Sequence, residues 1–133
     1  MKRFLIAAFM GLFAFAAPSY SQGKGQDVFV PISKYIEAGQ YENLSAWFAD
    51  NLELDVLGSV NNCSKNQAKL IVKSFFNEYT PKKFTIVHRS SKGPMMYAIG
   101  SLQAGGDKFR VTMYVKTSEK GENYILQFRI EKE

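Results

Sequence analysis

The chain contains only one cysteine and one histidine among its 133 residues, Cys63 and His88. A single cysteine excludes an intramolecular disulfide, and one thiol with one imidazole falls short of the several ligands that a protein zinc site uses. The sequence also lacks the G-x-S-x-G motif of serine hydrolases and the lysine-bearing glycine loop that binds nucleotide phosphates. We therefore expect no metal and no cofactor, and no catalytic motif identifies an enzyme.

The longest hydrophobic run is short. It extends over about 14 residues from Phe4 to Ala17, follows Lys2 and Arg3, and precedes Ser19 and Ser21. A basic start, an apolar segment and small residues before a cleavage point make up a secretory signal peptide. A transmembrane helix needs ~20 apolar residues, which weighs against the alternative of an uncleaved anchor. We predict that residues 1–21 are removed and that the protein is exported, as a periplasmic or secreted protein.

Removal of the signal leaves 112 residues, the size of one domain. Residues 22–26 are polar and glycine-rich and are expected to form a flexible leader, followed by a domain over 27–133. A chain of this length buries about two thirds of its unfolded surface, so it can fold without a disulfide or a metal. Cys63 is expected to be buried as a small hydrophobic residue; the alternative is a disulfide to another chain.

The charge of the chain is mildly positive. The net charge is +5 for the whole sequence and +3 without the signal, and the basic residues are scattered among acidic ones, with no run longer than Lys82-Lys83 in the remaining chain. Proteins that bind nucleic acid usually concentrate basic residues on one face. We therefore expect no nucleic-acid partner, and interpret the charge as favouring solubility and weak attraction to anionic surfaces.

Three helices are predicted in the first part of the domain. One runs from near Asp27, as N-cap, to Gly39, and a second from Tyr41 to Ala49. The third begins at a capping box formed by Ser64 and Gln67 and ends at Tyr79, before Thr80-Pro81. The apolar residues expected on their buried sides are Val28, Ile32, Tyr35, Ile36, Leu44, Trp47, Phe48, Ala68, Ile71, Val72, Phe75, Phe76 and Tyr79.

The remaining segments are predicted strands. Leu52–Val56 alternates apolar and acidic residues, as a half-buried strand does, and Val60 lies in a short hairpin partner. Four more strands, joined by short loops, are expected to form an antiparallel meander with one apolar and one wetter face. Tyr114 and Ile125 are expected on the wetter face. The four strands are predicted over residues 84–89, 95–103, 108–116 and 124–131.

The order of these elements resembles the nuclear transport factor 2-like (NTF2-like, cystatin-like) superfamily. The segments Asp27-Val-Phe-Val-Pro-Ile, Leu44-Ser-Ala-Trp-Phe-Ala-Asp, Cys63-Ser-Lys-Asn-Gln-Ala-Lys and Tyr97-Ala-Ile-Gly are more closely similar to the DUF4783 family, small exported proteins of Bacteroidota with no assigned activity. The resemblance covers residues 27–132. It implies an α+β fold in which a curved antiparallel sheet wraps around three N-terminal helices, as a cone with a cavity at its open end.

The same superfamily contains isomerase-like and dehydratase-like enzymes that use an Asp or a His facing this cavity, so Asp55 and His88 are the catalytic candidates. His88 shares a predicted strand face with Phe84 and Ile86, although at a strand end it is more often exposed. Asp55 is expected to face outward, because the apolar residues of its strand should face the helices. A shift of one residue would turn it into the pocket.

The sequence is rich in aromatic residues, with 11 phenylalanines and 7 tyrosines. Most should form the core, and some could line a pocket for an apolar ligand. The favoured hypothesis is a non-enzymatic exported domain that binds a small apolar ligand or a protein partner through its cavity or sheet face. The alternatives are an isomerase-like or dehydratase-like enzyme, and a structural envelope component that associates through its sheet, for example as a homodimer. The candidate ligand-binding residues are Trp47, Phe76, Tyr97, Phe109 and Tyr124.

Overall fold

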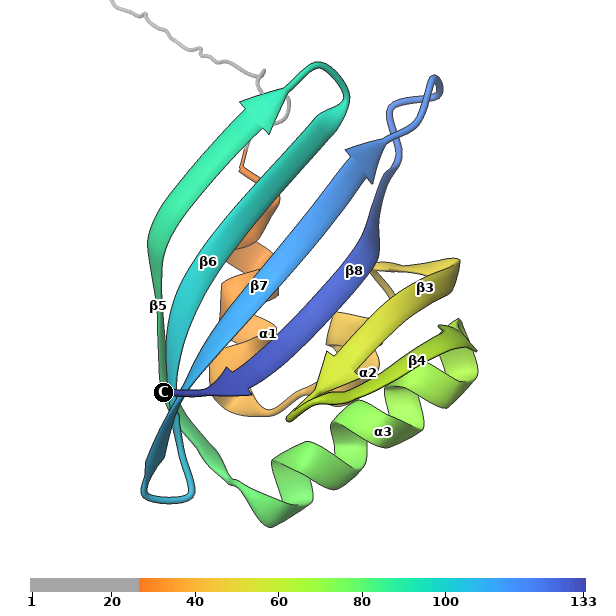
Figure 1. Cartoon of the computed structure of the whole chain (residues 1–133). Coiled ribbons are helices and arrows are strands. Elements are labelled where there is room, and N and C mark those ends of the chain that lie inside the picture. The colour runs from red at the N-terminus through yellow and green to blue at the C-terminus, as the bar shows by residue number, and fades with distance from the viewer. Residues whose placement is uncertain (1–26) are drawn as a thin grey trace, which may run out of the picture.

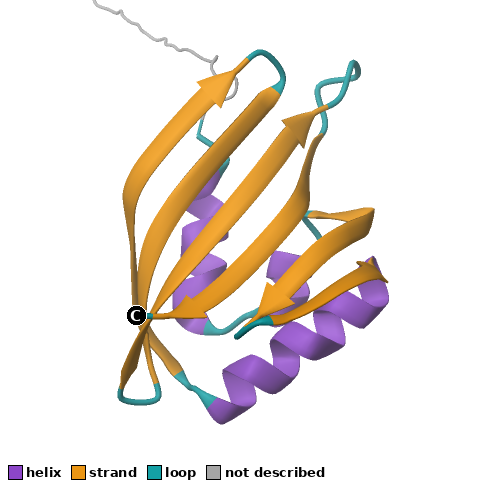
Figure 2. Ribbon diagram, viewed as in Figure 1, coloured by secondary structure: helices purple, strands orange, loops and turns teal. Residues whose placement is uncertain are grey.

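The computed structural model describes residues 27–133, so the predicted signal peptide and leader lie outside the described residues. One six-stranded sheet is backed by helices on a single face (Figures 1 and 2). The opposite face, turned toward the viewer in Figure 1, carries none of the described helices. Over the same residues no helix is long and apolar enough to cross a membrane. The predicted α+β class is therefore confirmed.

The elements follow the predicted order. The strands lie in the order β4-β3-β8-β7-β6-β5, with β3 and β8 parallel and all other neighbours antiparallel. Strands β5 to β8 therefore form the predicted meander, and the β3–β4 hairpin extends the sheet beside β8. The helices are α1 Phe29–Ala38, α2 Tyr41–Ser45 and α3 Lys65–Glu78. The strands are β3 Phe48–Val56, β4 Ser59–Ser64, β5 Pro81–Lys92, β6 Met95–Ala104, β7 Asp107–Thr117 and β8 Asn123–Lys132.

The two ends of α1 differ in how well they were predicted. Gly39 closes the helix with a left-handed backbone, φ 68°, as expected. At the other end Val28, not Asp27, is the N-cap, and no side chain caps the helix. The carboxylate of Asp27 instead pairs with Arg89 of β5 at 2.6 Å. This ion pair ties the start of the helix to the edge strand of the sheet.

The prediction of a second helix over Tyr41–Ala49 is wrong in its second half. The helix ends at Ser45, and β3 begins at Phe48. The carbonyl of Trp47 accepts a hydrogen bond from the Ile125 N–H at 2.7 Å, and Phe48 is fully buried with its ring 5.8 Å from that of Phe128. Pairing with β8 therefore overrides the local helical pattern, which cannot be told from a strand pattern in so short an apolar segment.

The capping box of α3 is confirmed. The Gln67 N–H donates to the Ser64 hydroxyl at 3.2 Å, and the Ser64 N–H donates to Gln67 Oε1 at 3.1 Å. The two faces of β3 are also as predicted: Leu52 and Leu54 are buried, while Glu53 and Asp55 lie on the other side. Cys63 is buried as well, and burial raises the pKa of its thiol.

Two β-bulges change which residues of their strands face the helices. In β8 the register shifts opposite Tyr114 and Val115, and Ile125 becomes fully buried, so its predicted place on the wetter face is wrong. In β5 the register shifts between Ile86 and His88 around the exposed Val87. His88 consequently pairs with Ile99 and leaves the face that holds Phe84. Each extra residue puts the alternation on one side of the bulge out of phase with that on the other side.

We use the name outer face for the side of the sheet that points away from the helices. Its residues follow from the strand registers and from the alternation of buried and solvent-accessible positions. They include Glu53, Asp55, His88, Tyr97, Ile99, Ser101, Arg110, Thr112, Tyr114, Lys116, Tyr124, Gln127, Arg129 and Glu131.

Candidate functional site

Three of the five aromatic candidates for ligand binding lie with the core. Phe109 is fully buried, with its ring 5.1 Å from Phe75 and 5.0 Å from Tyr79. Phe76 is buried on α3, with its ring 6.0 Å from that of Phe75. Trp47 is half-buried and packs against the same core. Their rings fill the space between the sheet and the helices.

The other two aromatic candidates lie on the outer face. Tyr97 of β6 stacks on Tyr114 of β7, with ring centroids 5.4 Å apart and 21° between the ring planes. Nε2 of His88, on β5, lies 3.1 Å from the Tyr97 hydroxyl oxygen. Three neighbouring strands thus carry a row of aromatic side chains, which we call the aromatic row (His88, Tyr97 and Tyr114).

Tyr124 lies apart from this row, at the start of β8. Its hydroxyl donates a hydrogen bond to Glu122 at 2.5 Å, and this bond is the main reason that the pKa of Tyr124 is raised. The five predicted aromatic residues are therefore divided between the core and the outer face. The structure does not bring them together into one site.

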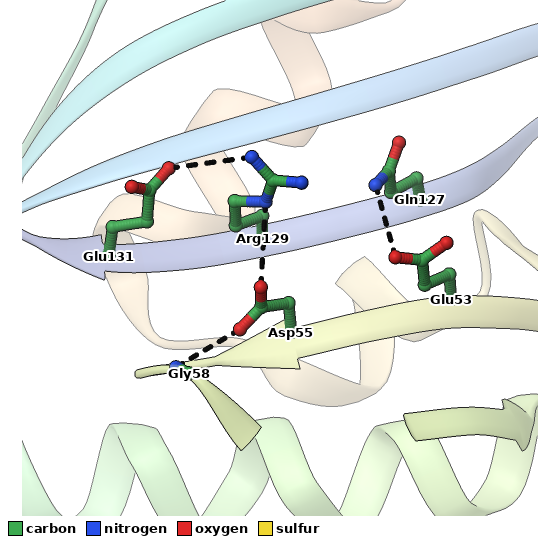
Figure 3. A network of polar contacts seen from close by, with 6 residues as sticks. All are labelled: Glu53, Asp55, Gly58, Gln127, Arg129 and Glu131. Atoms are coloured by element: carbon green, nitrogen blue, oxygen red, sulfur yellow. Dashed lines mark hydrogen bonds and ion pairs between the residues drawn. The ribbon is translucent and has the colours of Figure 1, made fainter. Parts of the chain in front are cut away.

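Asp55 belongs to a charged network across β3 and β8 (Figure 3). One carboxylate oxygen accepts a hydrogen bond from the Gly58 N–H at 3.1 Å, and the other lies 3.6 Å from Nε of Arg129. Nη1 of Arg129 is 3.8 Å from a carboxylate oxygen of Glu131. The guanidinium thus lies between two carboxylates, at distances longer than a hydrogen bond.

An open depression of about 450 Å³ adjoins this network. It opens beside the β3–β4 turn and the end of β8, whereas the family resemblance implied a cavity at the open end of the cone. Sequence reasoning did not find Arg129, because only the parallel pairing of β3 with β8 places it beside Asp55. The depression is lined by Asp55, Leu57, Gly58, Arg129, Glu131 and Lys132.

The two catalytic candidates are far apart. Asp55 lies on β3 and His88 on β5, with β8, β7 and β6 between them, which places them about 19 Å apart at the usual spacing of neighbouring strands. They cannot act together on one bond. Among residues 27–133 there is also no group of three His, Cys, Asp or Glu side chains arranged to hold a metal ion.

Comparison with known proteins places the chain in a family. The model of the DUF4783 family, described as a domain of unknown function, matches residues 29–131. No curated protein matches significantly.

Solved structures show the same fold. A DUF4783 family protein from Bacteroides ovatus is 25% identical, with a TM-score of 0.77 over 82% of this chain and 98% of that chain. One from Bacteroides uniformis is 20% identical, with a TM-score of 0.76 over 80% of this chain and 98% of that chain. An NTF2-like protein of unknown function from Cytophaga hutchinsonii is 10% identical, with a TM-score of 0.60 over 85% and 93% of the two chains. The chain therefore belongs to the DUF4783 family and has an NTF2-like fold.

Proposed function

We propose that this protein is an exported, non-enzymatic domain that binds a protein partner through the outer face of its sheet. The observation that carries the proposal is the aromatic row, which stands on a face that none of the described helices covers. Tyrosine is enriched at protein interfaces, because it combines a large apolar ring with a polar hydroxyl and has few rotatable bonds. Export rests on the basic, apolar and small-residue pattern of the first 21 residues.

The burial of the inner aromatic residues favours this proposal over a small apolar ligand inside the cone. Phe76 and Phe109 already pack against other aromatic rings, so a ligand that contacted them would have to displace core side chains. Protein interiors are packed too densely for such displacement to be cheap. The outer face, in contrast, is accessible without any rearrangement.

The environments of Asp55 and His88 weigh against an enzyme. An acid or base in catalysis usually sits in a concave, water-excluding site with a second group within reach of the same substrate. Asp55 is engaged by the Gly58 N–H and by Arg129, and His88 is exposed beside Tyr97. Either side chain can contact a bound partner without the second catalytic group that an enzyme needs.

Native mass spectrometry of the protein purified from its own envelope tests the proposal. We expect the wild-type chain to retain a protein. The double variant Tyr97→Ala/Tyr114→Ala should retain at least about tenfold less of it, since truncating a tyrosine at an interface hot spot costs about 2 kcal/mol or more. A mass of two copies would identify the partner as a second copy of this chain.

The matched control is Val30→Ala/Leu70→Ala, which removes two exposed apolar side chains from α1 and α3. It should retain the partner at the wild-type level. Retention of a small molecule alone, unaffected by the tyrosine substitutions, would contradict the proposal.

A further inference from the structure

The guanidinium of Arg129, on the outer face, has one buried donor without a hydrogen-bond partner within residues 27–133. Its Nε is buried and has no hydrogen-bond partner among the described residues. The two nearest carboxylates, of Asp55 and Glu131, stand 3.6 and 3.8 Å away, too far to accept a hydrogen bond. The side chain is nevertheless 40% exposed, and it lines the depression beside the β3–β4 turn. Its planar set of donors matches the two oxygens of a carboxylate.

The charges around the depression are balanced. Asp55 and Glu131 contribute two negative charges, and Arg129 and Lys132 two positive ones, with the Lys132 ammonium 3.5 Å from Asp107. A ligand with only a negative charge would meet the two carboxylates, and one with only a positive charge would meet the two cations. A ligand that carries both charges a few ångströms apart can pair with both kinds of group.

The lip of the depression is apolar. Leu57 is 44% exposed, and its backbone is left-handed at φ 54°, which is uncommon for a residue other than glycine, asparagine or aspartate. Its N–H donates to the Ile130 carbonyl at 2.8 Å, so the turn is held against β8 while the side chain stays at the surface. The volume of about 450 Å³ is in the range of small-molecule sites.

We propose that this depression binds a free α-amino acid with an apolar side chain. The ligand carboxylate accepts hydrogen bonds from Arg129, the ammonium pairs with Glu131, and the apolar side chain lies on Leu57. Glu131 is the better partner for the ammonium, because one oxygen of Asp55 already accepts from Gly58. This site lies on β3 and β8, at the opposite end of the outer face from the aromatic row on β5, β6 and β7, so its test does not require the protein partner proposed above.

Isothermal titration calorimetry on the full chain, as isolated from the producing cell, tests the proposal with L-leucine, N-acetyl-L-leucine and L-leucine amide. L-Leucine should bind with a dissociation constant of about 1 mM or below, and the two derivatives, each lacking one charge, about tenfold more weakly. Arg129→Gln should weaken leucine binding by about tenfold, whereas Arg89→Gln, the same change at a distant exposed arginine, should change it by less than about twofold.

A second variant keeps the test decisive if Arg129→Gln does not fold. Leu57→Asn suits a left-handed backbone, and it should weaken leucine binding by about threefold while leaving glycine binding unchanged. The proposal is overturned if leucine gives no saturable heat, if N-acetyl-L-leucine binds as tightly as leucine, or if Arg89→Gln is as harmful as Arg129→Gln. It is also overturned if Leu57→Asn weakens leucine and glycine equally.

Discussion

Replacing Phe109 with alanine should lower the free energy of unfolding by about 3–5 kcal/mol, the cost of removing a fully buried aromatic ring. The ring contacts Phe75 and Tyr79 edge-on, so the substitution removes aromatic contacts as well as buried area. A domain of this size is usually stable by about 5–15 kcal/mol, so the substitution removes a substantial fraction of that stability. Urea denaturation followed by circular dichroism measures the effect.

Val87→Ala provides the control, because that side chain is 64% exposed at the bulge of β5. It should change the free energy of unfolding by less than about 0.5 kcal/mol. A loss below about 1 kcal/mol for Phe109→Ala would contradict a filled interior. Such a small loss would instead support a ligand cavity between the sheet and the helices.

Gly100→Ala should destabilise the protein by about 1–3 kcal/mol, through overpacking against Phe84. A Cβ at position 100 would lie 2.2 Å from Cζ and 2.5 Å from Cε1 of the Phe84 ring. The ring is buried, and the Phe84 N–H donates to the Glu37 carboxylate at 2.9 Å, so the strand cannot simply retreat from α1. Urea denaturation measures this loss in the free energy of unfolding.

A double-mutant cycle separates this clash from other effects. In the Gly100→Ala background, Phe84→Leu should cost less than it does in the wild type, because the smaller side chain leaves room for the new methyl group. Ser101→Ala, the next residue on the opposite face of β6, should be nearly neutral. Strict additivity of Gly100→Ala and Phe84→Leu would contradict the close contact.

The sequence predicted those parts of the fold that local signals determine. The Ser64–Gln67 capping box and the left-handed Gly39 are fixed by interactions within a few residues, and both are confirmed. The alternation of Leu52 to Leu54 also gave the correct buried face, because its period matches the pleat of a strand.

The parts that were missed depend on contacts between distant segments. The pairing of Phe48 with Ile125 converts the end of a predicted helix into β3. The bulges beside Ile125 and His88 insert single residues that leave no mark in the alternation of the sequence. The charged site also depends on such a contact, because the pairing of β3 with β8 brings Arg129 beside Asp55. The sequence therefore indicated Asp55 as a candidate but not Arg129.

Photo-crosslinking in the producing cell tests most directly whether the outer face is the binding surface. A benzophenone-bearing phenylalanine would replace Tyr114 on the outer face in one variant, and Leu70 on the exposed side of α3 in the other. We expect the probe at position 114 to give a discrete crosslinked protein species that the probe at position 70 does not give. Crosslinking from position 70 alone, or equally from both positions, would contradict the proposed role of the outer face.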